Sequence, residues 1–124
     1  MSRLVREVFY PHPRDRVWAA LTDPEALALW LMPNDFAPRV GHAFTLRTEP
    51  GPGWDGVVHC RVLALDPPSH MAWSWRGGPV ETIVRFDLAS VAGGTRLRFE
   101  QDGFAGLQGN LVRLVFGAGF AVPA

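Results

Sequence analysis

The chain contains no lysine: all 12 of its basic residues are arginine, and 12 acidic residues bring its formal net charge to zero. A balanced charge argues against a protein that binds nucleic acid through the phosphate backbone, because such proteins carry a clustered positive excess. No apolar run reaches the roughly 20 residues that a membrane-spanning helix needs. We therefore predict neither a nucleic-acid partner nor a membrane span.

Cysteine is almost absent as well, since Cys60 stands alone and an intrachain disulfide is excluded. The lack of disulfides agrees with a reducing compartment, and Arg3 and Arg6 interrupt any signal-peptide core, so we expect a cytoplasmic protein. The four histidines show no metal-ligand spacing, and His59 and Cys60, as neighbours on a predicted strand, point to opposite faces. We therefore predict no metal and no cofactor.

Apolar periodicity and turn-forming residues divide the chain into helices and strands within one expected domain, residues 1–124. Helical spacing predicts short helices over residues 14–21 and from residue 24 to about residues 30–33. Strands are predicted over residues 4–10, 37–40, 42–48, 57–65, 70–76, 82–88 and 96–101, separated by turns rich in glycine and proline. A largely apolar terminal helix is predicted over residues 107–116.

Four of the predicted strands alternate, which places their apolar residues on one face of a sheet and their charged residues on the other. The apolar set comprises Phe44, Leu46, Met71, Trp73, Trp75, Val84, Phe86, Leu88, Leu97 and Phe99, with Gln101 at the same parity. A sheet with one apolar face needs a cover, and the predicted terminal helix supplies it.

Several segments in this order resemble the activator-of-Hsp90-ATPase-like family, which is related to START domains. They are PRDRVWAALTDP at residues 13–24, WLMP at 30–33, WSW at 73–75, GGTRL at 93–97 and QDGF at 101–104. The resemblance implies an α+β helix-grip fold of the START/Bet v 1 kind, in which a curved antiparallel sheet of six to seven strands holds an apolar pocket. Two departures are Gln101, where similar proteins often carry histidine, and the glycines at 117 and 119 in the last segment.

The same resemblance implies a ligand pocket between the sheet and the terminal helix. Its expected ligand contacts are Trp30, Phe44, Leu46, His59, Met71, Trp73, Trp75, Phe86, Phe99, Gln101, Leu111 and Val115. Trp54, in a loop rich in glycine and proline, is expected at the pocket mouth or on a partner. The alternative for the tryptophans is that they only fill the core, and for Gln101 and His59 that they bond within it.

The resemblance leaves three functions open. The first is binding of a small hydrophobic or amphipathic molecule without catalysis. The second is a co-chaperone-like module that contacts an Hsp90-type ATPase, and the third is a cyclase-like enzyme, for which the sequence offers no converging titratable groups. We also expect an apolar strip at Val112, Phe116, Phe120 and Val122 to be buried in a homodimer, unless the natural chain continues beyond Ala124.

Overall fold

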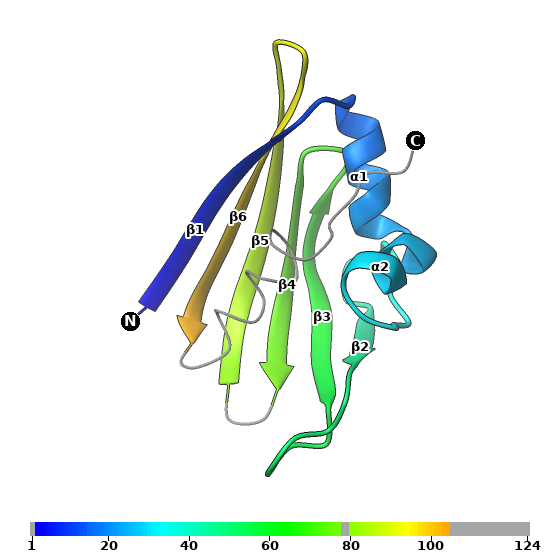
Figure 1. Ribbon diagram of the computed structural model, residues 1–124, viewed down its shortest axis with the longest axis vertical. Helices are drawn as coiled ribbons and strands as arrows, with labels where there is room; N and C mark the ends of the chain where they lie inside the picture. Colours follow the sequence, from blue (N-terminus) through cyan, green and yellow to red (C-terminus); the bar gives the residue numbers. More distant parts are fainter. Residues whose placement is uncertain (1, 78–79, 105–124) are drawn as a thin grey trace.

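Six antiparallel strands form one sheet in a computed structural model that describes residues 2–77 and 80–104 (Figure 1). The elements are β1 (Ser2–Tyr10), α1 (Arg14–Thr22), α2 (Pro24–Trp30), β2 (Ala43–Arg47), β3 (Val57–Asp66), β4 (His70–Gly77), β5 (Val80–Val91) and β6 (Gly94–Phe104). The strand order is β1-β6-β5-β4-β3-β2, so β2 to β6 form a meander and β1 closes one edge. The predicted terminal helix and the apolar strip after it lie outside the described residues.

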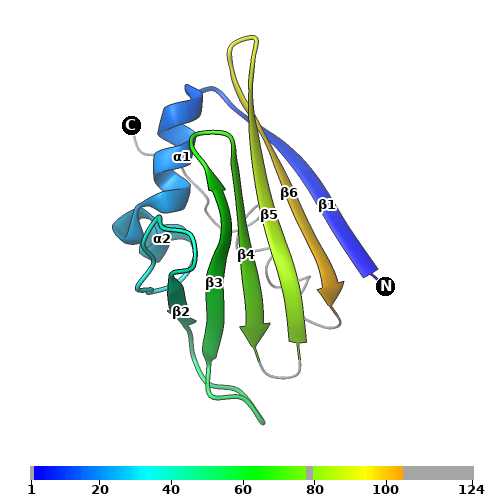
Figure 2. The same ribbon diagram turned by 180° about the vertical axis from the view of Figure 1, so that it is seen from behind.

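The two helices lie together at the end of the sheet near β2, and β1 and β6 lie at the opposite edge (Figures 1 and 2). Helix α1 contacts β5 and β6, so it crosses one face of the sheet. In the described part of the chain no helix is long and apolar enough to cross a membrane. This curved sheet with its helices on one face is the predicted α+β helix-grip fold.

Local chemistry explains why the helical segment divides into two. Asp23 ends α1 in an extended conformation, and its side chain accepts a hydrogen bond from the Glu25 backbone N–H at 3.1 Å. Pro24 occupies the first turn of α2, where its missing N–H costs nothing. Val17 and Leu21, one turn apart on α1, are both fully buried against the sheet.

The predicted strand over residues 37–40 is wrong. The segment turns there, with the Arg39 N–H donating to the Ala37 carbonyl at 2.8 Å, and Gly41 adopts a positive φ of 86°. Strands β5 and β6 are longer than predicted at both ends, and at the hairpin end the reason is that the turn between them is confined to residues 92–93. A register shift between Val62 and Ala64 places an additional residue, Leu63, in β3 and bulges that strand.

Alternation divides the sheet into an inner face, packed against the helices, and an outer face. The buried inner-face residues of β2 to β6 are Phe44, Leu46, Val58, Cys60, Val62, Met71, Trp73, Trp75, Thr82, Val84, Phe86, Leu88, Thr95, Leu97, Phe99 and Gln101. The outer face is polar, and cross-strand ion pairs such as Arg85–Asp102 at 3.0 Å link its strands. The hydrophobic core therefore lies wholly on the helix side of the sheet.

Candidate functional site

A row of aromatic rings runs across the inner face from β2 to β6. The rings of Phe44 and Trp73 are 5.1 Å apart, those of Trp73 and Phe86 5.0 Å, and those of Phe86 and Phe99 5.6 Å. Phe36, which sequence reasoning missed, joins the row at 5.1 Å from Phe44. These edge-on and tilted contacts are the geometry that aromatic rings prefer, so the row is a continuous apolar wall.

Most of the expected ligand contacts come together on this face. Phe44, Leu46, Met71, Trp73, Trp75, Phe86, Phe99 and Gln101 are all buried there, in the positions that the alternation predicts. Their contact with a ligand stays a prediction. The side chain of Trp30 lies outside what the structure describes, and so do Leu111 and Val115.

Three polar atoms in this apolar wall have no hydrogen-bond partner among the described residues. They are the indole N–H groups of Trp73 and Trp75 and the amide oxygen of Gln101. The three side chains are 1%, 3% and 0% exposed. Buried polar atoms are normally paired, because leaving one unpaired costs about 1–3 kcal/mol.

The strand register brings these polar groups into one region. Trp75 lies opposite Thr82, while Trp73 lies opposite Val84, which in turn lies opposite Gln101. The Gln101 amide nitrogen donates to the Thr82 hydroxyl at 3.1 Å, so one half of the amide is paired and the other is not. Thr82 was not predicted, although it shares the parity of Val84 and Phe86.

The inner face is also nearly free of charge. Burial raises the pKa of the Cys60 thiol, with a smaller contribution from the Asp35 carboxylate, so Cys60 is a neutral thiol near pH 7. Burial likewise raises the pKa of Tyr10 at one end of this face. Arg6 shares the inner parity on β1, but it is exposed and donates to the Val5 carbonyl.

The expectation that His59 projects into the apolar pocket is wrong. His59 pairs with Thr45 and Arg76 and is exposed on the outer face, because Val58 and Cys60 take the inner positions of β3. The parity of Arg61, two residues along the same strand, was the signal that could have placed it.

Trp54, expected at the pocket mouth or on a partner, is half-buried at the edge of the core, and its contact with a ligand or partner stays a prediction. The loop folds back on itself through two hydrogen bonds of 3.0 Å between Gly51 and Trp54. The indole N–H donates to the Val57 carbonyl at 3.1 Å, and the ring is half-buried against the core. Trp54 therefore closes the end of the core, and its polar atom is already paired.

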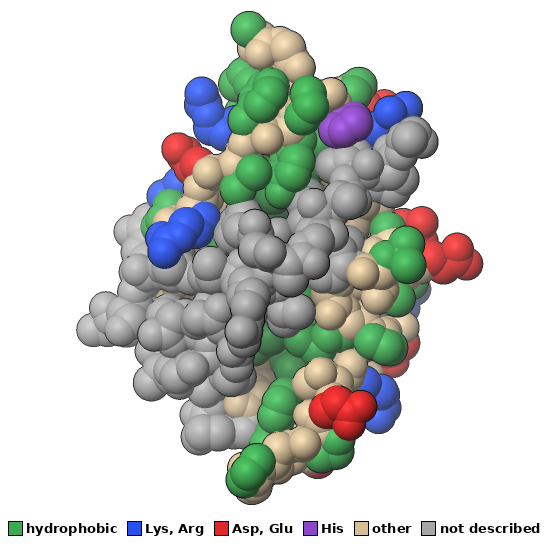
Figure 3. All heavy atoms as spheres, in the orientation of Figure 1, with side chains coloured by type: hydrophobic (Ala, Val, Ile, Leu, Met, Phe, Trp, Pro, Cys, Tyr) green, Lys and Arg blue, Asp and Glu red, His purple; other side chains and the backbone are tan. Residues whose placement is uncertain are grey.

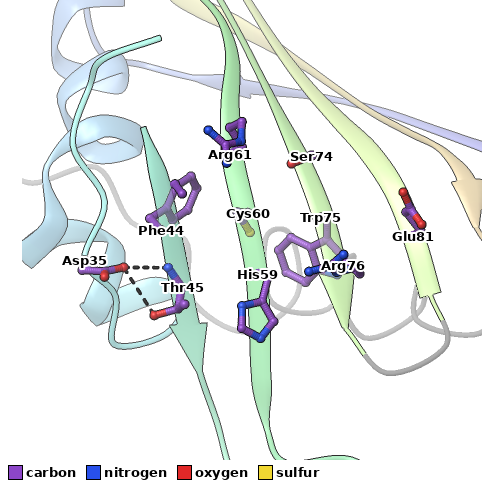
Figure 4. A pocket seen from close by; sticks show the side chains of 11 residues that line it. Asp35, Phe44, Thr45, His59, Cys60, Arg61, Ser74, Trp75, Arg76 and Glu81 are labelled. Atoms are coloured by element: carbon purple, nitrogen blue, oxygen red, sulfur yellow. Dashed lines mark hydrogen bonds between the residues drawn. The ribbon is translucent and has the colours of Figure 1, made fainter. Parts of the chain in front are cut away.

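A shallow depression of about 380 Å³ lies on the outer face, opposite the predicted pocket (Figure 4). Short side chains at Ala43, Thr45 and Ser74 leave the space, and Figure 4 shows Arg61 and Arg76 beside it. Its lining is polar and mixed in charge, with Glu81 on one side and Asp35 on the other.

Asp35 is held in place at the rim of this depression. Its carboxylate accepts hydrogen bonds from the Thr45 backbone N–H at 2.6 Å and from the Thr45 hydroxyl at 3.3 Å. These bonds, the backbone one first, hold the pKa of Asp35 below its ordinary value. Such a depression does not suit a hydrophobic ligand, and among the described residues no cluster could hold a metal ion.

Large exposed hydrophobic side chains come from separate segments of the described chain. Phe9 lies on β1, Leu29 on α2, Val40 in the loop before β2 and Leu63 at the β3 bulge. Figure 3 shows hydrophobic side chains at the end of the β5–β6 hairpin, at the top of the view, with charged groups nearby.

Comparison with known proteins places the chain in a family. The model of the family described as "Activator of Hsp90 ATPase homolog 1-like protein" matches residues 11–120. The chain belongs to this family. The match confirms the resemblance seen in the sequence and includes every inner-face residue of β2 to β6, but not β1. No curated protein matches the chain.

Solved structures of similar fold support the family assignment. Protein MLL2253 from Mesorhizobium loti is 35% identical with a TM-score of 0.77, over 92% of this chain and 85% of that one. BH1534 from Bacillus halodurans is 28% identical with a TM-score of 0.69, over 87% and 75%. CV1439 from Chromobacterium violaceum is 25% identical with a TM-score of 0.69, over 82% and 79%. The neighbours of this activator-of-Hsp90-ATPase-like chain are START/polyketide cyclase-like proteins.

Proposed function

We propose that this chain binds a small hydrophobic or amphipathic molecule against the inner face of its sheet. The observation that carries the proposal is the set of three buried polar atoms, on Trp73, Trp75 and Gln101, that lack partners among the described residues. Small-molecule sites are lined by apolar and aromatic side chains with a few polar groups that orient the ligand. The inner face has this composition.

A core that served packing alone would have little reason to keep these atoms. Phenylalanine at 73 or 75, or leucine at 101, would fill similar space without a buried polar atom. A bound molecule with its own polar group removes the cost, because it supplies the missing hydrogen bonds. Membership in a family with a START-like fold points to the same side of the sheet.

The two alternative functions have less support. A co-chaperone role on an Hsp90-type ATPase, which the family description suggests, would need an exposed patch. Trp54, the candidate partner contact, is packed half-buried against the core with its indole N–H paired. A cyclase-like enzyme needs titratable groups that converge on the ligand. Cys60 is a titratable group of the described inner face, and burial keeps its thiol protonated. The proposal therefore assigns no reaction.

Titration with N-phenylnaphthylamine, an uncharged fluorophore that brightens in apolar surroundings, tests the proposal. We expect saturable binding of one molecule per chain. Trp75→Leu should weaken it several-fold, because Trp75 lies on the inner face. The matched control is Arg76→Gln, the next residue on β4, which faces outward and should leave binding unchanged.

Circular dichroism of both variants checks that each retains its sheet. The proposal fails if wild-type protein shows no saturable binding. It also fails if Arg76→Gln weakens binding as much as Trp75→Leu does, since the probe would then sit on the outer face. If the probe binds as expected, native mass spectrometry of protein purified without denaturation gives the mass of the natural ligand.

A further inference from the structure

Building on the proposed function, we infer that the ligand is an uncharged molecule whose apolar body carries a carbonyl or hydroxyl oxygen. This oxygen accepts hydrogen bonds from the indole N–H groups of Trp73 and Trp75. A second polar group, or the hydroxyl itself, pairs with the free half of the Gln101 amide. The inference concerns the chemistry of the ligand, which the fold alone does not specify.

The indole N–H groups specify an acceptor. An indole nitrogen can only donate, so its partner must be a lone-pair atom such as a carbonyl, hydroxyl or ether oxygen. Trp73 and Trp75 are two residues apart on β4, so their Cα atoms are separated by about 6.6 Å along one strand face. Both donors thus belong to one region of the inner face, and a purely hydrocarbon ligand would leave both unpaired.

The Gln101 amide adds a second polar contact. Its nitrogen donates to the Thr82 hydroxyl, and its oxygen has no partner in the described part of the chain. If the amide were turned over, the hydroxyl would donate to the oxygen and the nitrogen would be the unpaired atom. Either orientation leaves one amide atom for the ligand, and a hydroxyl can pair with both kinds because it donates and accepts.

Among the described residues, none of those opposite these atoms carries a charge, which disfavours an anionic group on the ligand. The residues opposite Trp73, Trp75 and Gln101 are uncharged; they are Val62, Val84, Cys60, Thr82 and Leu4, and the Cys60 thiol is neutral. Arg6, two residues from Leu4 on β1, is exposed and donates to the Val5 carbonyl. A carboxylate buried here would lose its hydration without gaining a cationic partner, and this loss costs far more than the hydrogen bonds return. An uncharged oxygen pays no such penalty.

Three naphthalenes with the same substitution position separate these possibilities by displacing N-phenylnaphthylamine. They are acetylnaphthalene, isopropylnaphthalene, which has a similar shape without oxygen, and naphthoate, which is anionic. We expect acetylnaphthalene to bind about tenfold more tightly than isopropylnaphthalene, because it satisfies buried donors that the hydrocarbon leaves unpaired. Naphthoate should bind more weakly than the ketone.

Two variants assign the preference to the indoles. The first is the double variant Trp73→Phe with Trp75→Phe, in which acetylnaphthalene and isopropylnaphthalene both lose some ring contact. The ratio of the affinities of these two naphthalenes should nevertheless fall toward one. Trp54→Phe is the matched control, since its indole N–H is already paired with the Val57 carbonyl, and it should keep the tenfold ratio.

The outcomes distinguish this inference from the proposed function. Equal affinities of wild-type protein for acetylnaphthalene and isopropylnaphthalene would overturn the inference and leave the proposed function standing. Tighter binding of naphthoate would also overturn it. If no naphthalene displaces the probe and the probe itself does not bind, the proposed function fails, and the inference fails with it.

Discussion

The buried pair of Thr82 and Gln101 allows the cost of an unpaired polar atom in this core to be measured. One bond joins the amide nitrogen to the hydroxyl, while the amide oxygen lacks a partner among the described residues. Replacing both residues by apolar ones of similar shape, Thr82→Val with Gln101→Leu, removes all these polar atoms. At about 1–3 kcal/mol for each unpaired buried group, we expect the double variant to gain about 1.5 kcal/mol of unfolding free energy.

The single variants should behave differently from the double variant. Thr82→Val leaves both halves of the Gln101 amide unpaired and should lower the free energy of unfolding by about 1.5 kcal/mol. Gln101→Leu exchanges one unpaired atom, the amide oxygen, for another, the Thr82 hydroxyl, and should change the free energy of unfolding little. The effects are therefore non-additive, with a coupling of about 3 kcal/mol, near the upper end for residues in direct contact.

Urea unfolding of protein refolded from denaturant, and so free of ligand, measures all four chains. The slope of unfolding free energy against urea should be the same in each, so that midpoints report stability alone. A double variant as unstable as the sum of the two single variants would refute the reasoning, because it would mean that the amide oxygen is satisfied within the chain. If Gln101→Leu still binds acetylnaphthalene more tightly than isopropylnaphthalene, the preference for the ketone comes from the indole N–H groups and not from the Gln101 amide.

Three further predictions concern other parts of the molecule. Val17→Asp should abolish folding, because Val17 is fully buried and an unpaired carboxylate costs several kcal/mol there. The control, Ala19→Asp on the exposed side of the same helix, should lower the melting temperature only slightly. Cys60 should resist alkylation at pH 8 in the native protein, because burial raises the pKa of its thiol, and it should react once urea unfolds the chain. Rapid alkylation of the native protein would contradict the burial of Cys60. The depressed pKa of Asp35 means that its contribution to stability is complete above the ordinary value of 3.8 and is lost as pH falls through the lower folded value. Thermal melts of Asp35→Asn should therefore depend less on pH below 4 than those of the wild type, and identical pH profiles would count against the bonds from Thr45.

Alternation allowed the inner face to be predicted where strands are regular. Trp73, Trp75 and Phe86 lie where their parity placed them, because β4 and β5 pair without a register shift. The prediction of Gln101 on the same face succeeded for the same reason. The unpaired state of these polar atoms could not be predicted, since hydrogen-bond partners depend on distances across three strands.

The errors arose where long-range contacts override local pattern. The local sequence around Trp54 is rich in glycine and proline and does not indicate that the Gly51–Trp54 bridge folds its ring onto the core. His59 was placed by its chemistry instead of its parity. The Leu63 bulge shifts the alternation of β3 by one residue, and no residue type in that strand predicts the bulge.

The pairing of β1 with β6 has a consequence for how the chain folds. Each of the other neighbouring strand pairs joins consecutive strands of the meander, but Ser2 pairs with Phe104 and Tyr10 with Thr95. Of the described strands, β1 is synthesised before β6 by nearly the whole described chain, so it must wait for β6 before it gains a neighbour. Contacts so distant in sequence slow folding, because the intervening chain must first be ordered. During synthesis β1 is therefore a strand without a neighbour, and unpaired strands of this kind are prone to aggregate.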